Sequence, residues 1–110
     1  ARVVTSATRP FALERVNDAW VRLCGFSADE AVGKTLACLQ GPLSERDEIT
    51  KIVDQAARGH AYSALITNYT KQGQRFQNFL RVVPLVRGND DAQPSHMLGV
   101  LQDVQPQLAG

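Results

Sequence analysis

Apolar residues recur along the chain with two different periods. Between Ile49 and Ala57 they fall at positions i, i+3, i+4, i+7 and i+8, which is the period of an amphipathic helix. Ser44 together with Asp47 predicts where this helix starts, and Gly59 predicts where it ends. Because the apolar residues form a single stripe, we expect the helix to pack on the domain with one face only.

After this helix the period of the apolar residues changes to two, which is typical of strands with one buried face. Residues 62–70 and 76–85 are predicted to form a hairpin, with its turn at residues 71–73. Residues 96–104 are predicted to form a last strand, and residues 87–94 form a polar loop before it. This half of the chain therefore predicts three antiparallel strands.

The part of the chain before the long helix carries shorter patterns. Residues 3–5 and 13–16 are expected to form short strands. A short helix follows, capped by Asn17 or Asp18, and Gly25 is expected to stop it. The first half of the chain therefore adds two strands and short helices.

One further helical turn is predicted where Ser27 and Glu30 have the spacing of a capping box, and it ends at Gly33. Two groups of strands separated by a helical insert predict an α+β domain, with an antiparallel sheet and helices on one face. A cavity can form between the sheet and the insert. We expect a single domain over residues 1–104 and a C-terminal tail or linker over residues 105–110.

Composition narrows the classes of function. A net charge of +1 gives no reason to expect nucleic-acid binding, and no apolar run reaches the roughly 18 residues that would span a membrane. Cys24 and Cys38 lie in apolar surroundings and are expected to be buried thiols of a soluble, intracellular (cytoplasmic) protein. His60 and His96 are isolated, so no metal site is expected. The serines assigned to helix caps leave no nucleophile–base pair, and we expect no enzyme.

Several sequence motifs, together with this order of predicted elements, resemble one family. They resemble the PAS superfamily and, within it, the light-oxygen-voltage (LOV) flavin-binding photosensors; the motifs are VNDAWVRLCGFSADEAVGKT, LQGP, NYTKQGQRFQN and GVLQD. The resemblance covers residues 3–104 and implies the PAS fold, a five-stranded antiparallel sheet with helices packed on one face. PAS domains generally sense a ligand or dock a partner and pass the signal to an attached effector, without turnover of a substrate.

The resemblance also locates the family's ligand helix, which begins after Gly33. In LOV domains this segment carries Asn, then the adduct-forming Cys, then a phosphate-binding Arg. This chain has Thr35, Leu36 and Ala37 at those positions. Leucine has no thiol, so the resemblance implies a LOV-type domain that lacks the adduct-forming cysteine. Gln40, whose counterpart contacts the ribityl chain of the flavin, is retained.

A second phosphate-binding arginine of the family corresponds to Val53 in the long helix. Each charged hydrogen bond contributes on the order of 1.5–3 kcal/mol, so losing the arginines at Ala37 and Val53 weakens the expected affinity for FMN by about two to four decades. The phosphate end of the family's cofactor therefore has no matching cation in this sequence register.

Five positions on the predicted strands also correspond to the family's flavin contacts. Asn68 and Asn78 match two asparagines that bind the pyrimidine edge of the flavin, Leu80 matches an apolar wall residue, and Gly99 matches a small residue that leaves room for the ring. Leu101 stands where the family has a glutamine that reads the flavin ring and relays the signal. The two amides need hydrogen-bond partners, which are either a ligand or each other, water and nearby backbone.

Two functional hypotheses follow from the resemblance. In the first, the domain binds no flavin and is an interaction or dimerisation module of a larger signalling protein, with its cavity collapsed around Leu36 and Leu101. In the second, it binds FMN or riboflavin through Gln40, Asn68 and Asn78 without forming an adduct. Five changed positions against three retained polar contacts favour the first hypothesis.

The sheet face opposite the cavity carries a second candidate site. Phe79, Val83, Leu98 and Val100 share that face, which is more apolar than a solvated surface. PAS and LOV domains commonly pair through this surface or cover it with a flanking helix. We therefore expect a homodimer or an effector contact there, with coverage by the terminal segments as the alternative.

Overall fold

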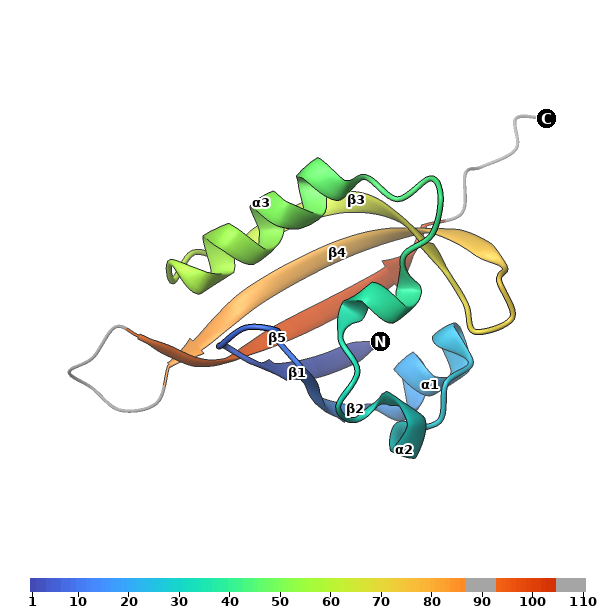
Figure 1. The fold of residues 1–110 in the computed structure, drawn as a ribbon, viewed down its shortest axis with the longest axis horizontal. Helices are drawn as coiled ribbons and strands as arrows, with labels where there is room; N and C mark the ends of the chain where they lie inside the picture. Colours follow the sequence, from blue (N-terminus) through green and yellow to red (C-terminus); the bar gives the residue numbers. More distant parts are fainter. Residues whose placement is uncertain (87–92, 105–110) are drawn as a thin grey trace.

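The structure, a computed structural model, describes residues 1–86 and 93–104. Five antiparallel strands form one sheet in the order β2-β1-β5-β4-β3 (Figure 1). The strands are β1 Arg2–Ser6, β2 Leu13–Val16, β3 Tyr62–Tyr69, β4 Arg75–Val86 and β5 Pro94–Asp103. The predicted α+β class and the predicted sheet are confirmed.

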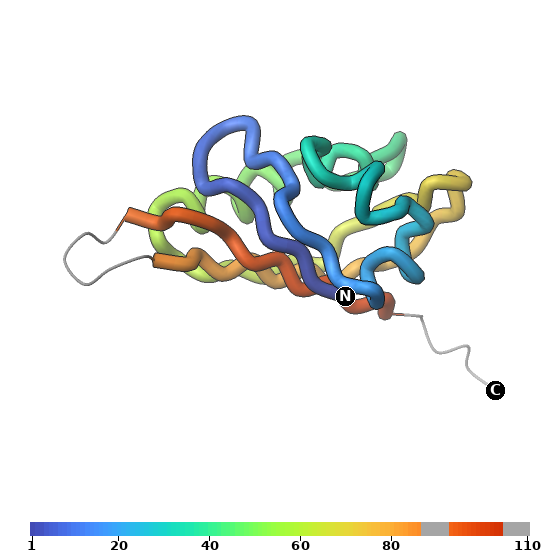
Figure 2. The backbone as a smooth tube through the Cα atoms, turned by 90° about the horizontal axis from the view of Figure 1, so that it is seen from below, coloured from blue at the N-terminus to red at the C-terminus, as the bar shows by residue number. Residues whose placement is uncertain are grey.

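The helical segments connect β2 to β3 and lie on one face of the sheet, as the turned view in Figure 2 shows. They are α1 Asp18–Cys24, α2 Ala28–Ala31, the 3₁₀ helix η1 Leu36–Leu39 and α3 Arg46–Ala57. The apolar stripe of α3 faces the sheet, with Ile52 and Ala56 fully buried. The core therefore lies between the sheet and this helical layer.

The predicted caps of the two short helices are confirmed. Asn17 Oδ1 accepts a hydrogen bond from Trp20 N at 3.0 Å, and Gly25 ends α1 in the left-handed region at φ 84°. Ser27 Oγ accepts from Glu30 N at 3.1 Å, and the Glu30 carboxylate accepts from Ser27 N at 3.0 Å. Local side-chain chemistry thus determines both helix starts.

The prediction that Ser44 caps the long helix is wrong. Helix α3 begins at Arg46, and its N-cap residue Glu45 makes no side-chain cap bond. Ser44 Oγ instead donates to Thr67 O at 2.6 Å and accepts from Gly41 N at 3.0 Å. The neighbouring strand β3 offers this serine a tertiary partner, and the sequence spacing alone could not indicate it.

Alternation along β4 and β5 assigns each residue to a sheet face. The residues on the inner face, toward the helices, are buried: Phe76, Asn78, Leu80, Val82, Met97, Gly99 and Leu101. The intervening residues point to the outer face, which no helix of the described chain covers (Figure 2). The two faces therefore carry two different candidate surfaces.

Some expectations fall outside the described part of the chain. Most of the predicted loop 87–94 and the whole tail 105–110 lie outside it, so these two expectations and the domain boundary at residue 104 stay predictions. Among the helices that the structure describes, none combines the length and the apolar character needed to cross a membrane.

Candidate functional site

A cavity of about 170 Å³ lies between the inner face of the sheet and the helical layer. Strands β1, β3, β4 and β5 form one wall, which we call the strand wall. Residues 35–40 and α3 form the opposite wall, and this wall together with the connecting residues 41–45 is what we call the roof. All the sequence-predicted ligand residues line this cavity: Leu36, Gln40, Asn68, Asn78, Leu80, Gly99 and Leu101. The structure thus brings residues from distant parts of the chain around one space.

The expectation that this space is collapsed around two leucines is wrong. Leu36 and Leu101 line the cavity from opposite walls, and space remains between them. Leu101 is buried and Leu36 is half-buried. The separation of the walls is set by the packing of the sheet and α3 rather than by these two side chains alone.

Sequence reasoning missed several lining residues. They are Val3, Thr5, Phe11, Ile49, Ile52 and Met97. The alternation in β1 and β5 and the stripe of α3 could have indicated most of them, because Val3, Thr5 and Met97 lie on the inner face of the sheet, and Ile49 and Ile52 belong to the apolar stripe of α3. Phe11 had no such signal, because it belongs to the loop between β1 and β2.

The two asparagines bind each other and the backbone. Asn78 Nδ2 donates to Asn68 Oδ1 at 2.9 Å, and Asn78 Oδ1 accepts from Gln102 N at 3.1 Å. Asn68 Nδ2 donates to Leu39 O at 3.1 Å and to Thr67 O at 3.3 Å. Because backbone N–H groups only donate and carbonyls only accept, these partners fix the orientation of both amides. Of the alternatives open from the sequence, pairing with each other and with backbone is the one the structure contains.

The remaining polar side chains of the lining differ in their partners. Thr5 Oγ1 donates to Ser6 O at 2.9 Å, and Thr35 Oγ1 accepts from Ala37 N at 3.2 Å. The half-buried amide of Gln40 has no hydrogen-bond partner within residues 1–86 and 93–104. Gln40 is therefore the lining side chain whose polar atoms are free to meet a ligand.

The cavity lining contains neither of the two cysteines of the chain. Both are free thiols; Cys24 is buried and Cys38 is half-buried and packs on the core. Burial, and secondarily the nearby Cys38, raises the pKa of Cys24 to about 12, and burial raises the pKa of Cys38 above its ordinary value. Both thiols thus stay protonated near neutral pH, and neither faces the ligand space.

Gly99 and Leu101 shape the strand wall on β5. A Cβ atom on Gly99 would lie 2.9 Å from Val3 Cγ2, so a side chain there would force β1 to shift. Leu101 faces the cavity, whereas Gln102 pairs with Phe79 on the other face of the sheet. The strand places the glutamine amide outside the cavity because the β4–β5 register is regular at this point.

The roof is attached to edge strand β3 by a carboxylate. Glu45 Oε1 accepts from Thr67 N at 2.7 Å, and its Oε2 accepts from Thr67 Oγ1 at 2.9 Å. Desolvation raises the pKa of Glu45, but the backbone and side-chain hydrogen bonds from Thr67 outweigh it, so that the pKa is lowered. Because β3 is an edge strand, no neighbouring strand accepts a hydrogen bond from Thr67 N on that side. The ionised Glu45 carboxylate accepts it instead.

A second attachment of the roof uses an aromatic ring. Tyr69 Oη accepts from Leu43 N at 3.1 Å. The ring lies directly over Gly41, where a Cβ atom would be 2.3 Å from Tyr69 Cε1. Glycine is therefore the residue that allows the chain to pass under this ring and reach α3.

The β1–β2 loop borders the cavity where it reaches the surface. Pro10 and Ala37 are exposed lining residues, and Phe11, with φ 64°, is a half-buried one. The Arg9 guanidinium lies 5.4 Å from the centroid of the Phe11 ring and 3.7 Å from the Asp54 carboxylate on α3. The ion pair thus joins this loop to the roof, and the cation–π contact lies within the loop.

On the outer sheet face the predicted interface residues lie in adjacent strands. Phe79 is 43% exposed and pairs across strands with Leu65, which is 50% exposed. Val83 pairs with Leu98 two residue pairs further along this face, and Val100, which is half-buried, pairs with Arg81 between them. These apolar residues, which we call the apolar row, are therefore interrupted by Arg81 between Phe79 and Val83.

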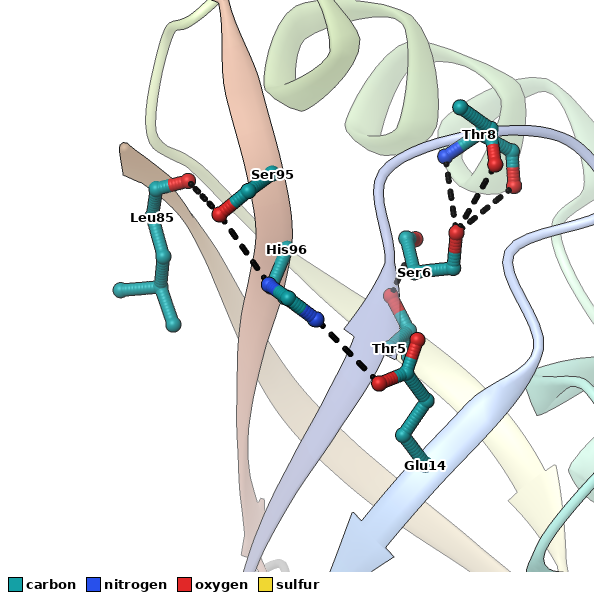
Figure 3. A network of polar contacts seen from close by, with 7 residues as sticks. All are labelled: Thr5, Ser6, Thr8, Glu14, Leu85, Ser95 and His96. Carbon is teal, nitrogen blue, oxygen red and sulfur yellow. Dashed lines mark hydrogen bonds and ion pairs between the residues drawn. The ribbon is translucent and has the colours of Figure 1, made fainter. Parts of the chain in front are cut away.

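A polar network borders that row (Figure 3). His96 Nε2 lies 3.2 Å from Glu14 Oε1, and His96 Nδ1 lies 3.1 Å from Ser95 Oγ. Ser95 Oγ donates to Leu85 O at 3.3 Å. These contacts connect β2, β4 and β5 outside the cavity.

An antiparallel sheet with helices on one face and a cavity beneath them defines a ligand-binding or partner-binding type of α+β domain. The family model for the PAS domain matches residues 5–106, and the chain belongs to the PAS domain family.

Individual relatives and a solved structure are also similar to the chain. The chain is 30% identical over 109 residues to phototropin-2 of Oryza sativa subsp. japonica, which covers 98% of this chain and 12% of that protein. It is 34% identical over 89 residues to a blue-light-activated histidine kinase of Rhizobium johnstonii, covering 80% of this chain and 26% of the kinase. The light-state structure of the blue-light photoreceptor Aureochrome1 LOV superimposes with a TM-score of 0.86 at 25% identity, covering 96% of this chain and 81% of that one. The similar region is thus a minor part of both full-length relatives.

Proposed function

We propose that this chain is a LOV-like PAS domain of a larger signalling protein that works without cysteinyl–flavin photochemistry. Its role is that of a protein–protein interaction or dimerisation module, and it is not itself an enzyme. The similarity to phototropin-2 and to a blue-light-activated histidine kinase supports a position beside an effector domain.

One observation carries the photochemical part of the proposal. Leu36 lines the cavity at the position that the family resemblance assigns to the reactive cysteine. An adduct requires a sulfur atom that attacks a flavin carbon, and a leucine side chain has no nucleophilic atom. Cys38 does not replace it, because Cys38 does not line the cavity.

Absorbance spectroscopy tests this part. Purified protein with added FMN is expected to show no light-induced bleaching of flavin absorbance. Leu36→Cys combined with Leu101→Gln is expected to restore bleaching if flavin enters, whereas Leu36→Ala, which removes the side chain without adding a thiol, is the matched control. Bleaching of the unmodified protein would overturn the proposal.

The second candidate function is a flavin-binding sensor that acts without an adduct. The Gln40 amide, which lines the cavity and has no partner among the described residues, favours it, since it is available to a heterocyclic ligand. A yellow protein that retains FMN or riboflavin through purification would support this candidate. A colourless protein that takes up neither flavin would contradict it.

The interaction surface we propose is the outer sheet face, and the partner is a second copy of the chain. A two-fold pairing buries the same apolar row from both copies and needs no partner of different chemistry. Arg2 and Arg81 pair with Val100 between the Phe79 and Val83 positions of the row, and Glu14 lies beside His96, beyond Leu98.

Light scattering on a sizing column tests the dimer. Phe79→Asp is expected to convert a dimer to a monomer, because a carboxylate would be buried in the apolar row. Val32→Asp introduces the same kind of charge at a residue that is 54% exposed and outside the sheet, and it is expected to leave the dimer intact. A monomeric unmodified protein contradicts self-pairing and leaves an effector domain as the occupant of this face.

A further inference from the structure

We propose that the cavity binds a compact, uncharged and largely apolar molecule of about one aromatic ring. This inference rests on the proposed function, because it names the ligand class of the same cavity once flavin chemistry is set aside. The size of the cavity and the charge and hydrogen bonds of its lining residues support this ligand class.

The size of the cavity matches a single ring. Its volume is about 170 Å³, whereas sites for drug-sized ligands measure roughly 300–1,000 Å³. An apolar protein cavity of about 150 Å³ accommodates benzene. The volume therefore matches a ring of the size of toluene or p-cresol, whereas a three-ring heterocycle needs more space.

The charge of the lining excludes ionic ligands. Among the described residues, none that lines the cavity is ionisable. The cation at the rim, Arg9, is already paired with Asp54 and lies over the Phe11 ring. A phosphate or carboxylate in the cavity would lose its hydration without gaining a cationic partner, which is unfavourable.

The hydrogen bonds of the strand wall exclude ligands that need many polar contacts. Asn78 is fully buried and binds Asn68 and the Gln102 backbone. A ligand that competed for these atoms would have to break an existing pair in a low-dielectric environment. A ring without such groups leaves the pair intact and contacts apolar atoms only.

The roof permits one polar group on the ligand. Gln40 lines the cavity at the end of η1, and its amide has no protein partner among the described residues. A single hydroxyl directed at Gln40 would gain one hydrogen bond. We therefore expect p-cresol to bind more tightly than toluene, and Gln40→Leu to lower the ratio of the two affinities.

Met97 provides a direct reporter for the test. It is the single methionine of the chain, it is buried, and it lines the cavity. With ¹³C-methyl methionine in the whole 110-residue chain, one resonance reports on the ligand space. Titration with toluene is expected to shift this resonance saturably, and toluene at ten times its Kd is expected to raise Tm by on the order of 5 °C.

Matched variants separate cavity binding from surface binding. Val53→Phe fills the cavity from α3 and is expected to weaken toluene binding at least about tenfold. Val32→Phe makes the same replacement at an exposed residue outside the cavity, and it is expected to bind like the unmodified protein. Equal loss in both variants would overturn the assignment of the site.

The outcomes distinguish this inference from the proposed function. If the folded protein and its Leu36→Ala variant, which has a larger cavity, show no Met97 shift with toluene or p-cresol, the ligand inference is wrong. Tighter binding of FMN than of toluene would also overturn it. In both cases the proposed function stands as long as illumination causes no bleaching, because only bleaching contradicts that proposal.

Discussion

The strand wall and the roof of the cavity are held in place by different means. The strand wall is buried, with Asn78 at 0%, Leu101 at 3% and Leu80 at 7% exposure, and the regular β4–β5 register fixes each side chain. The roof is half-buried around Leu36 and Gln40, and side-chain bonds to edge strand β3 attach it.

This difference changes how the retained polar residues are to be understood. Asn68 and Asn78 match the family's ligand contacts, yet on the strand wall their amides bind each other and backbone groups. Gln40 matches a ligand contact on the roof and has no such partner among the described residues. A residue type that the family uses for a ligand is therefore structural on one wall and available on the other.

The largest expected loss in the free energy of unfolding comes from a substitution in the strand wall. Asn78→Leu leaves the partly buried Gln102 N–H and the buried Asn68 Oδ1 without partners. Each unpaired buried group costs about 1–3 kcal/mol, so we expect a loss of about 3 kcal/mol in the free energy of unfolding. Urea denaturation measures it, with the exposed Gln74→Leu as a control that is expected to change stability by less than about 0.5 kcal/mol.

If Asn78→Leu were as stable as the control, the amide pair would not be stabilising the strand wall. That outcome would make a ligand role for Asn68 and Asn78 the better explanation of their position.

A smaller effect is expected where the roof passes under Tyr69. Gly41→Ala places a Cβ atom in the volume of the Tyr69 ring, and we expect a loss of about 2 kcal/mol because the ring or the roof must move. The steric cause predicts strong coupling: in a Tyr69→Ala background, Gly41→Ala should cost almost nothing. Additive losses in this double-mutant cycle would contradict a clash with the ring.

The sequence predicted the strand wall well and the roof poorly, for a physical reason. Alternation in β4 and β5 is a local property, so parity predicted which residues share a face, and the family resemblance indicated that Asn78, Leu80, Gly99 and Leu101 face the cavity. The α+β class followed in the same way from the order in which strand-like and helix-like spacings of apolar residues occur along the chain. Which partners the asparagines choose depends on Leu39 and Gln102, which are distant in sequence, and parity does not determine this.

The roof depends on contacts between segments that are far apart in the chain. Ser44 has the spacing of a helix cap but binds Thr67, because β3 brings a carbonyl within 2.6 Å. Phe11 reaches the cavity through a loop with a positive φ, and no periodic pattern indicates such a loop. Contacts of this kind exist only after the sheet and helices have packed.

A third prediction concerns the pH dependence of the roof attachment. Glu45→Gln removes the charge that Thr67 N and Thr67 Oγ1 bind, and at pH 7 we expect a loss of about 1 kcal/mol. Because the pKa of Glu45 is lowered in the folded protein from 4.5, its contribution is present above about pH 4.5. It is lost as the pH falls through the folded-state pKa.

The difference between the unmodified protein and Glu45→Gln should therefore shrink in acid. Urea denaturation at a series of pH values from 7 to about 3 measures this difference, since the other carboxylates titrate equally in both proteins. A difference that stays constant over that range would show that the charge of Glu45 does not stabilise the roof.

The smallest expected effect tests the free amide of the roof. Gln40→Leu removes polar atoms that have no partner among the described residues, so we expect the free energy of unfolding to change by less than about 0.5 kcal/mol. The same kind of replacement at Asn78 is expected to cost several times more, although both residues line one cavity. Urea denaturation of the two variants under identical conditions compares the walls directly. A loss at Gln40 as large as that at Asn78 would mean that the roof amide is also a structural group, and the distinction between the two walls would be wrong.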